Sequence, residues 1–277
     1  MKITAKTKIC IIIGDPVEHS LSPQMHNAAY EALGIEDQFV FLGARVNVEN
    51  VGDVVTAMKV MGIRGLTCTI PHKMEVMKFI EPENIDPVAR KIGAVNTVVN
   101  DNGVIKGYNT DWLGVLTPLE SVTSLQGKKV AVLGAGGAAR AMIYAVTSKG
   151  ASFTVYNRTL DKAEELAKEF GGQGKSLDDV AEITQADIIL NATALGMHPD
   201  ENETPLPKEY ITNKHIVFDA IYVPYETRLL KEAKEQGAQI IHGLDMLLYQ
   251  GLPQFEIYTN QKAPEDVMRK VLMSKFE

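Results

Sequence analysis

A glycine-rich loop lies between an apolar run and a helical pattern near the middle of the chain. The apolar run Lys129–Leu133 leads directly into the segment 134–140, which reads GAGGAAR. This segment fits GxGxxG/A, where Gly134 permits a tight turn, Gly136 lets the backbone approach a pyrophosphate, and Ala139 allows close helix packing. The alternative is a tight turn that binds no ligand. The residues that we predict at the phosphates of a dinucleotide are Gly134, Ala135, Gly136, Gly137 and Ala138.

The chain beyond this loop continues as regular strand and helix units. Short β-branched runs alternate with helical patterns, which is typical of an α/β fold with a doubly wound, mostly parallel sheet. The expected strands are 129–133, 153–156, 187–191, 216–220 and 239–241, and the expected helices are 138–148, 161–170 and 225–236. The segment 244–277 reads as one or two helices without a strand.

The chain before residue 111 has a different pattern. Asn100–Gly103 is a run of turn residues between the strands 95–99 and 104–108, which predicts a hairpin and so a mixed sheet. Ser22 is expected as the N-cap of a helix, with Pro23 at its first position. The remaining elements that we expect are strands 9–13, 39–42 and 65–70 and an amphipathic helix 51–61.

These patterns predict two lobes with a deep cleft between them. Residues 1–108 would form a mixed-sheet substrate domain, completed by C-terminal helices 245–277. Residues 109–244 would form a Rossmann domain for the dinucleotide.

The composition narrows the classes of partner. The chain has 277 residues with 28 Lys and Arg against 35 Asp and Glu, a net charge of −7, so it offers no broad positive field for nucleic acid or a membrane surface. The two cysteines, Cys10 and Cys68, show no metal or disulfide spacing. No apolar stretch approaches a membrane span or a signal peptide, so a cytoplasmic setting is expected. The oligomeric state, monomer or homodimer, stays open.

The end of the second strand after the glycine loop predicts which cofactor binds. An NAD site normally has a carboxylate there for the ribose 2′-hydroxyl. Here the strand is followed by Asn157, Arg158 and Thr159, whose cationic fork and polar groups suit a 2′-phosphate. NADP is therefore expected, against the alternative that Arg158 is an ordinary surface arginine. Arg140 either helps to clamp the same phosphate or faces solvent.

Polar side chains in the first hundred residues follow strand ends and turns, where a substrate site would lie. Lys73 comes just after a strand that ends at Pro71, and Asp111 is a natural carboxylate partner for it. Such a lysine can donate a proton to a carbonyl oxygen, although a lone Lys and a lone Asp are more often solvated charges. His72 is expected to be a non-catalytic surface or lining residue.

Nine motifs occur in one order over nearly the whole chain, and together they resemble the shikimate dehydrogenase family. They are Ser20-Leu21-Ser22-Pro23, Thr69-x-Pro71-x-Lys73, Gly93–Thr97, Gly107–Asp111, the glycine loop, Asn157-Arg158-Thr159, Asn191-Ala192-Thr193-x-x-Gly196-Met197, Asp219-x-x-Tyr222-x-Pro224 and Gly243–Leu247 followed by Gln250-Gly251. The resemblance implies NADPH-dependent, reversible reduction of 3-dehydroshikimate to shikimate, without a metal.

The resemblance also implies roles for individual positions. Lys73 matches the proton donor, and Asp111 matches the residue that orients it and binds a substrate hydroxyl. The other matched substrate residues are Ser20 and Ser22 for the carboxylate, Thr69, Asn96 and Gln250 for the ring hydroxyls, and Tyr222 near substrate and nicotinamide. The residues matched to the nicotinamide and its ribose are Thr193, Met197, Gly243 and Met246.

One position departs from the family pattern, and two other functions stay open. Thr67 stands where bacterial members often have asparagine, which puts a contact of that asparagine in doubt. A quinate/shikimate dehydrogenase of broader specificity is the nearest alternative, although Ser20 and Thr69 favour shikimate. A non-catalytic, NADP-responsive regulatory protein is a further alternative, but such proteins usually lack the pair formed here by Lys73 and Asp111.

Overall fold

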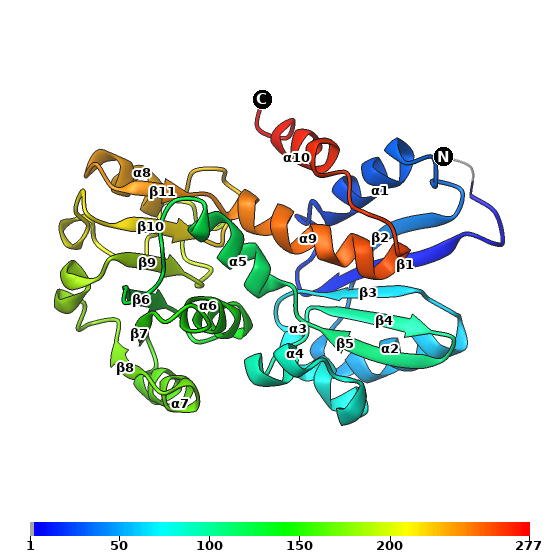
Figure 1. Cartoon of the computed structure of the whole chain (residues 1–277), viewed down its shortest axis with the longest axis horizontal. Coiled ribbons are helices and arrows are strands. Elements are labelled where there is room, and N and C mark those ends of the chain that lie inside the picture. Colours follow the sequence, from blue (N-terminus) through cyan, green and yellow to red (C-terminus); the bar gives the residue numbers. More distant parts are fainter. Residues whose placement is uncertain (1–2) are drawn as a thin grey trace. The chain divides into compact units, whose positions relative to one another are not determined.

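The computed structural model describes residues 3–277, which divide into two compact units (Figure 1). Unit 1 contains residues 3–110 together with Gln250–Glu277, and unit 2 contains Asp111–Tyr249. The second division falls inside one long helix, α9 (Gly243–Thr259), which therefore supplies residues to both units.

Within the described residues, unit 1 has one five-stranded mixed sheet of order β2-β1-β3-β4-β5. The strands are β1 (Lys8–Gly14), β2 (Phe39–Arg45), β3 (Gly65–Cys68), β4 (Thr97–Asp101) and β5 (Val104–Tyr108). β1 pairs in parallel with β2 and β3, whereas β3–β4 and β4–β5 are antiparallel. The helices are α1 (Ser22–Ala32), α2 (Val51–Val60), α3 (His72–Glu75), α4 (Pro87–Ile92) and α10 (Glu265–Met273), with short 3₁₀ turns η1 (Val48–Asn50), η2 (Val76–Phe79) and η3 (Pro82–Asn84).

Helices cover both faces of this sheet. On one face, Val55 and Met58 of α2 pack with Leu66 of β3 and Val98 of β4 in a buried cluster. On the other face, aromatic side chains from α1, β2 and α9 gather around His26, whose ring stacks on Phe41 at 4.4 Å between centroids. The middle of the sheet is therefore buried on both sides, whereas the second half of β2 stays exposed, including Leu42.

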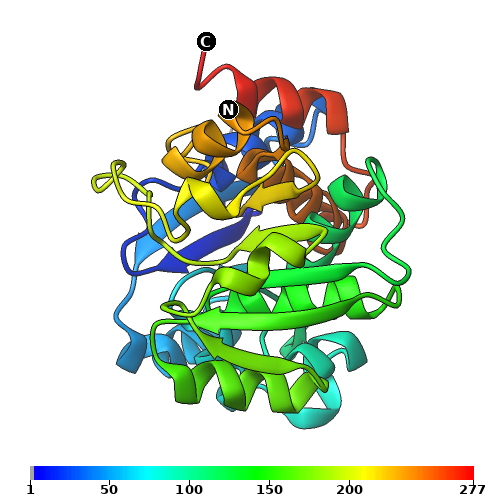
Figure 2. The same ribbon diagram turned by 90° about the vertical axis from the view of Figure 1, so that its left-hand side faces the viewer.

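Unit 2 has a six-stranded parallel sheet of order β11-β10-β9-β6-β7-β8 within residues 111–249 (Figure 2). The strands are β6 (Lys129–Leu133), β7 (Ser152–Asn157), β8 (Gln173–Ser176), β9 (Ile188–Asn191), β10 (Ile216–Asp219) and β11 (Gln239–Ile241). The helices are α5 (Asp111–Glu120), α6 (Gly137–Thr147), α7 (Leu160–Phe170) and α8 (Arg228–Glu235), with 3₁₀ turns η4 (Ala181–Gln185) and η5 (Lys208–Tyr210). The predicted α/β class, with one mixed and one doubly wound sheet, is confirmed.

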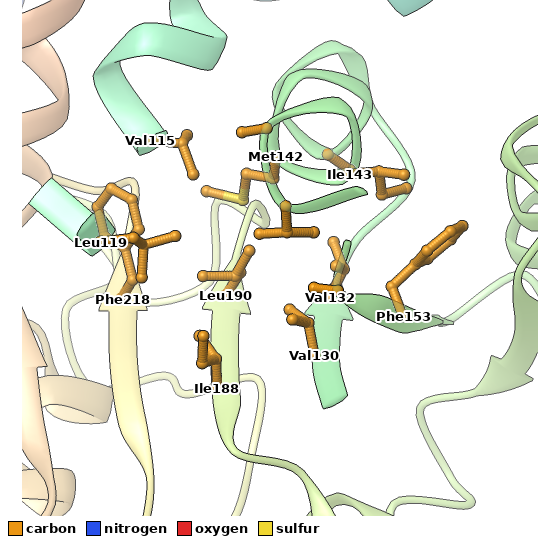
Figure 3. Packing of buried hydrophobic residues seen from close by; sticks show 14 of the residues in the cluster. Val115, Leu119, Val130, Val132, Met142, Ile143, Phe153, Ile188, Leu190 and Phe218 are labelled. Carbon is orange, nitrogen blue, oxygen red and sulfur yellow. The ribbon is translucent and has the colours of Figure 1, made fainter. Parts of the chain in front are cut away.

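Alternate residues of the central strands of unit 2 pack into two different cores. Val130 and Val132 of β6 face α5 and α6, where they meet Val115 and Met142 (Figure 3). Ala131 and Leu133 of the same strand belong to a second cluster with Leu229 and Leu230 of α8. A strand buried on both faces needs apolar residues at every position, which explains the continuous run KVAVL.

Two local predictions were wrong. Ser22 is the first helical residue of α1 rather than its N-cap, because the carbonyl of Leu21 accepts the first helical hydrogen bond, from the amide of Met25 at 3.0 Å. Pro23 accordingly takes the second helical position instead of the first. The strand β8 was not predicted at all, since its sequence QGKS has no apolar alternation and lies at the edge of the sheet.

No helix among residues 3–277 is long and apolar enough to cross a membrane.

Candidate functional site

The loops and short helix starts at one edge of the unit 1 sheet carry Ser20, Ser22, Thr69, Lys73 and Asn96 of the residues that we predicted for the substrate. The parallel strands β1 and β3 end at this edge, and the antiparallel partners place the start of β4 and the end of β5 there as well. Backbone hydrogen bonds hold the loops in register: the amide of Thr69 donates to Ile13 at 2.9 Å, and that of Cys68 donates to Asn96 at 2.8 Å. Residues from four separate segments are thus fixed on one rigid frame.

Of the two predicted serines, Ser20 lies in the loop between β1 and α1, and Ser22 is the first residue of α1. The amide of Ser22 donates to the hydroxyl oxygen of Ser20 at 3.3 Å, and Ser22 is almost fully buried. Gly14 at the end of β1 is tightly packed, because a Cβ there would lie 2.5 Å from Cγ2 of Thr69. The close approach brings Thr69 beside the strand that carries the serine loop.

Asn96 is the centre of a buried polar cluster. Its Oδ1 accepts from the Thr97 hydroxyl and from the Thr110 amide, each at 2.8 Å. Its Nδ2 donates to the Thr110 hydroxyl at 2.9 Å and to Oε1 of Gln250 at 3.3 Å. Two donors on one side and two acceptors on the other fix the orientation of the Asn96 amide. The structure therefore brings together Asn96 and Gln250, which are 154 residues apart in sequence.

A further residue, Gln254, supports this cluster and was missed by sequence reasoning. Its Nε2 donates to the Thr97 hydroxyl at 2.9 Å, so that hydroxyl must donate its own proton to Asn96. The side chains of Gln250 and Gln254 are one helical turn apart in α9, a spacing that places them on one helix face and could have indicated the pair.

Burial lowers the pKa of the neighbouring His26 to about 3, with an opposing effect of Gln254, so His26 is neutral.

Lys73 lies half-buried in α3, directly after β3. Its carbonyl accepts from the amide of Val95 at 2.8 Å, which anchors its backbone next to Asn96. Burial raises the pKa of the Cys68 thiol to about 12, although the charge of nearby Lys73 acts in the opposite direction. Cys68 is thus a neutral, buried thiol. His72 is fully buried, which excludes the surface alternative and leaves the non-catalytic lining role as a prediction.

Asp111 is the first residue of α5 and is 3% exposed. It follows Thr110, whose amide is bonded to Asn96. Asp111 therefore comes one residue after the Asn96 cluster along the chain.

Thr67, the position that departs from the family pattern, belongs to the packing between β3 and α9. Its hydroxyl is hydrogen-bonded to the hydroxyl of Tyr258 at 2.9 Å, and both side chains are buried. Thr67 pairs with Thr97 across β3 and β4, and their partners Tyr258 and Gln254 are one turn apart in α9. Thr67 therefore helps to dock the helix that carries Gln250.

The glycine loop of unit 2 has the geometry that a dinucleotide requires. Gly134 has φ +104°, and a Cβ there would lie 3.1 Å from Cγ2 of Thr193. A Cβ at Gly136 would meet no described heavy atom within 4 Å, so the space over the first turn of α6 is open. Ala139 is fully buried against the sheet. The strand order reverses between β6 and β9, the place where doubly wound folds bind nucleotides.

The two arginines near this loop differ in their surroundings. Arg140 forms a bidentate ion pair with Glu169 of α7, at 2.6 and 2.7 Å, so its side chain does not simply face solvent, and its role at the phosphate stays a prediction. Arg158 is exposed after β7 and has no side-chain partner among residues 3–277. Asn157 stabilises this turn, because its Nδ2 donates to the Thr159 carbonyl at 2.9 Å. Arg158 is therefore an exposed cation at the turn after β7, and its contact with a 2′-phosphate stays a prediction.

The predicted nicotinamide residues of unit 2 lie around the ends of β9 and β10. Thr193 donates its amide and hydroxyl to Oδ1 of Asn191, at 2.9 and 2.8 Å. Gly243 approaches the turn after β10 so closely that a Cβ would lie 2.3 Å from the Ile221 carbonyl oxygen. Tyr222 and Met197 are half-buried, whereas Met246 packs within the hydrophobic cluster under α5 and α6. No cluster of metal-ligand residues occurs among residues 3–277.

Comparisons with known proteins match these two units along nearly the whole chain. Family models match residues 12–98 as a shikimate dehydrogenase substrate binding domain, 118–224 as shikimate/quinate 5-dehydrogenase, and 243–273 as a shikimate 5′-dehydrogenase C-terminal domain. The chain belongs to the shikimate dehydrogenase family. The resemblance carried by the nine motifs is thereby confirmed.

Individual relatives cover almost the full length. Shikimate dehydrogenase (NADP(+)) of Carboxydothermus hydrogenoformans is 43% identical over 98% of this chain and 99% of its own. The Methanosarcina acetivorans protein of the same name is 44% identical over 96% of this chain and 98% of its own. A crystal structure of a shikimate dehydrogenase in complex with NADP⁺ has a TM-score of 0.91 at 41% identity, covering 99% of this chain and 98% of that one.

Proposed function

We propose that this chain catalyses the NADPH-dependent, reversible reduction of 3-dehydroshikimate to shikimate. The observation that carries the proposal is the buried cluster of hydroxyls and amides around Asn96, at the sheet edge where the Lys73 backbone is also anchored. A small ring that bears a carboxylate and several hydroxyls needs such a set of neutral donors and acceptors. The relatives named shikimate dehydrogenase (NADP(+)) support the same substrate and cofactor.

The substrate would bind to unit 1, which we propose as the substrate-binding domain. Ser20 and Ser22 would hold the carboxylate through their hydroxyls. Gln250, whose Oε1 accepts a hydrogen bond from Asn96, would bond a ring hydroxyl. Thr69, beside the end of β1, would bond a second hydroxyl, and Tyr222 would lie near the substrate and the nicotinamide.

Lys73 is proposed as the proton donor, with Asp111 as its partner. Reduction adds a hydride to the carbonyl carbon and a proton to the carbonyl oxygen, and the Lys73 ammonium would supply that proton from Nζ. Asp111 would orient the ammonium and accept a hydrogen bond from a substrate hydroxyl. In the reverse direction, neutral Lys73 takes the hydroxyl proton and releases it to water. General acid catalysis of this kind contributes roughly 10²–10⁴-fold.

Unit 2 is proposed as the NADP domain. NADPH, when bound, supplies the hydride. The amides at the start of α6 and the open space at Gly136 would accept its pyrophosphate. Arg158, Asn157 and Thr159 would bind the 2′-phosphate, and Thr193, Met197, Gly243 and Met246 would line the nicotinamide end.

The function is tested by following the reduction of NADP⁺ and NAD⁺ spectrophotometrically, with shikimate and quinate side by side. We expect shikimate with NADP⁺ to give the highest kcat/KM. A quinate kcat/KM equal to or above that of shikimate would instead establish the broader quinate/shikimate specificity. Absence of turnover with either acid, together with measurable NADP⁺ binding, would establish the regulatory alternative.

A further inference from the structure

Asp219 is a fully buried carboxylate that the proposed reaction does not use. It ends β10 and accepts three hydrogen bonds: from Asn191 Nδ2 at 2.9 Å, from the Ile221 amide at 3.0 Å and from the Thr227 hydroxyl at 2.7 Å. All three donors are neutral, and no ion pair to Asp219 occurs within the described chain. Removing a charged carboxylate from water costs free energy, and hydrogen bonds from neutral donors offset only part of this cost. Asp219 is therefore a residue whose presence calls for an explanation.

The bond to Asn191 sets the orientation of a second amide. An ionised carboxylate only accepts hydrogen bonds, so Asn191 must turn Nδ2 towards Asp219. Its Oδ1 then points the other way, where it accepts both the amide and the hydroxyl of Thr193. Without the carboxylate, the Asn191 amide could rotate and present Nδ2 to the Thr193 amide, which cannot accept a hydrogen bond.

The other two bonds of Asp219 fix the loop after β10. The Ile221 amide closes the turn that leads to Tyr222, and Thr227 is the N-cap of α8 at the far end of that loop. The same turn presents the Ile221 carbonyl to Gly243 at close range. The two loops are also linked directly, since the amide of His198 donates to the Val223 carbonyl at 3.2 Å.

We propose that Asp219 is a positioning residue that holds the loops after β9 and β10 in the arrangement that binds the nicotinamide half of NADP. This inference rests on the proposed function, because the cofactor contacts themselves come from it. Asp219 would act through Asn191 on Thr193 and through Ile221 on Tyr222 and Gly243, without touching the cofactor.

The test compares Asp219→Ala with Asp219→Asn by isothermal titration of NADP⁺. Asparagine keeps one oxygen that can accept from Asn191 and Ile221, whereas alanine keeps none. We expect Asp219→Ala to raise the NADP⁺ Kd roughly tenfold or more, with a clearly smaller rise in the shikimate KM at saturating NADP⁺. The NADP⁺ Kd of Asp219→Asn should stay within about threefold of the wild-type value, a change no larger than the loss of one hydrogen bond would cause.

A matched control is Asp187→Ala, just before the start of β9, the neighbouring strand that ends at Asn191. Asp187 precedes β9 and accepts from the Lys129 amide and the Lys128 ammonium, at 2.8 and 3.1 Å. Its removal should leave the NADP⁺ Kd unchanged. If Asp219→Ala does not fold, Asp219→Thr replaces it in the test. Threonine fills the space and suits a strand, but it has a single oxygen on a shorter side chain. The same rise in the NADP⁺ Kd is expected.

Hydrogen exchange gives a readout that needs no cofactor. Peptides that cover 191–198 should exchange faster in Asp219→Ala than in the wild type or Asp187→Ala. A wild-type Kd and wild-type exchange in Asp219→Ala would overturn the inference, as would an equal loss of NADP⁺ and shikimate binding. Failure of the wild type itself to bind NADP⁺ would instead refute the proposed function.

Discussion

The most informative single substitution in the Asn96 cluster is Thr97→Val. Valine has nearly the shape of threonine, so the change removes the hydroxyl with little effect on packing in β4. Thr97 is fully buried, and its hydroxyl bonds Asn96 at 2.8 Å and Gln254 at 2.9 Å. The substitution thus isolates the contribution of these two hydrogen bonds.

The expected loss of stability follows from the groups that are left unpaired. Gln254 Nε2 loses its acceptor in a buried site, which costs about 1–3 kcal/mol. Oδ1 of Asn96 keeps the Thr110 amide, so its loss is smaller, about 1 kcal/mol. We therefore expect Thr97→Val to lower the free energy of unfolding by about 2–4 kcal/mol.

The assay is urea unfolding of the wild type, Thr97→Val and Thr97→Ser, with the shikimate KM measured in parallel. Thr97→Ser keeps the hydroxyl and loses one buried methyl group, about 1 kcal/mol. Only the valine variant should raise the shikimate KM, because the Asn96 and Gln250 amides then lose their fixed orientation. Equal midpoints and equal KM values for the wild type and Thr97→Val would refute this reasoning.

Two further predictions concern pH and the cofactor. The pKa of His26 is about 3 in the folded chain and about 6.5 in the unfolded chain, so only the unfolded chain binds a proton between these values. The contribution of neutral His26 to stability is therefore complete above pH 6.5 and is lost as the pH falls towards 3. At pH 5 this lowers the free energy of unfolding by about 2 kcal/mol. His26→Phe, which keeps the stack on Phe41, should remove this part of the loss in urea unfolding at pH 5 and 7.5, and an unchanged pH dependence would contradict it. Arg158→Asp should weaken NADPH roughly 10–100-fold more than NADH in fluorescence titrations. A Lys162→Asp control should leave that ratio alone, and an unchanged ratio in Arg158→Asp would exclude the 2′-phosphate contact.

Features set by local chemistry were predictable from the sequence. The turn between β4 and β5 has positive φ at Asn102 and Gly103, which are the residue types that tolerate it. Gly134 likewise has the positive φ that the glycine loop requires. In both places the backbone conformation depends on a few adjacent residues, so the pattern alone is sufficient.

Features that depend on distant partners were not predictable. Arg140 pairs with Glu169, 29 positions away on another helix, and nothing in the local sequence indicates that pairing. The role of Gln254 depends on the docking of α9 against β4, 157 residues earlier in the chain. The edge strand β8 forms through backbone pairing with β7, so its polar sequence gave no strand signal.

The central claim is that Lys73 supplies the proton in the reduction of 3-dehydroshikimate, and Lys73→Met tests it most directly. Methionine has a similar length without the ammonium, and Lys78→Met, at an exposed lysine paired with Glu75, is the matched control. We expect kcat of Lys73→Met to fall by at least ~10²-fold with an unchanged NADP⁺ Kd, and Lys78→Met to behave as the wild type. A kcat of Lys73→Met close to that of the wild type would contradict the account.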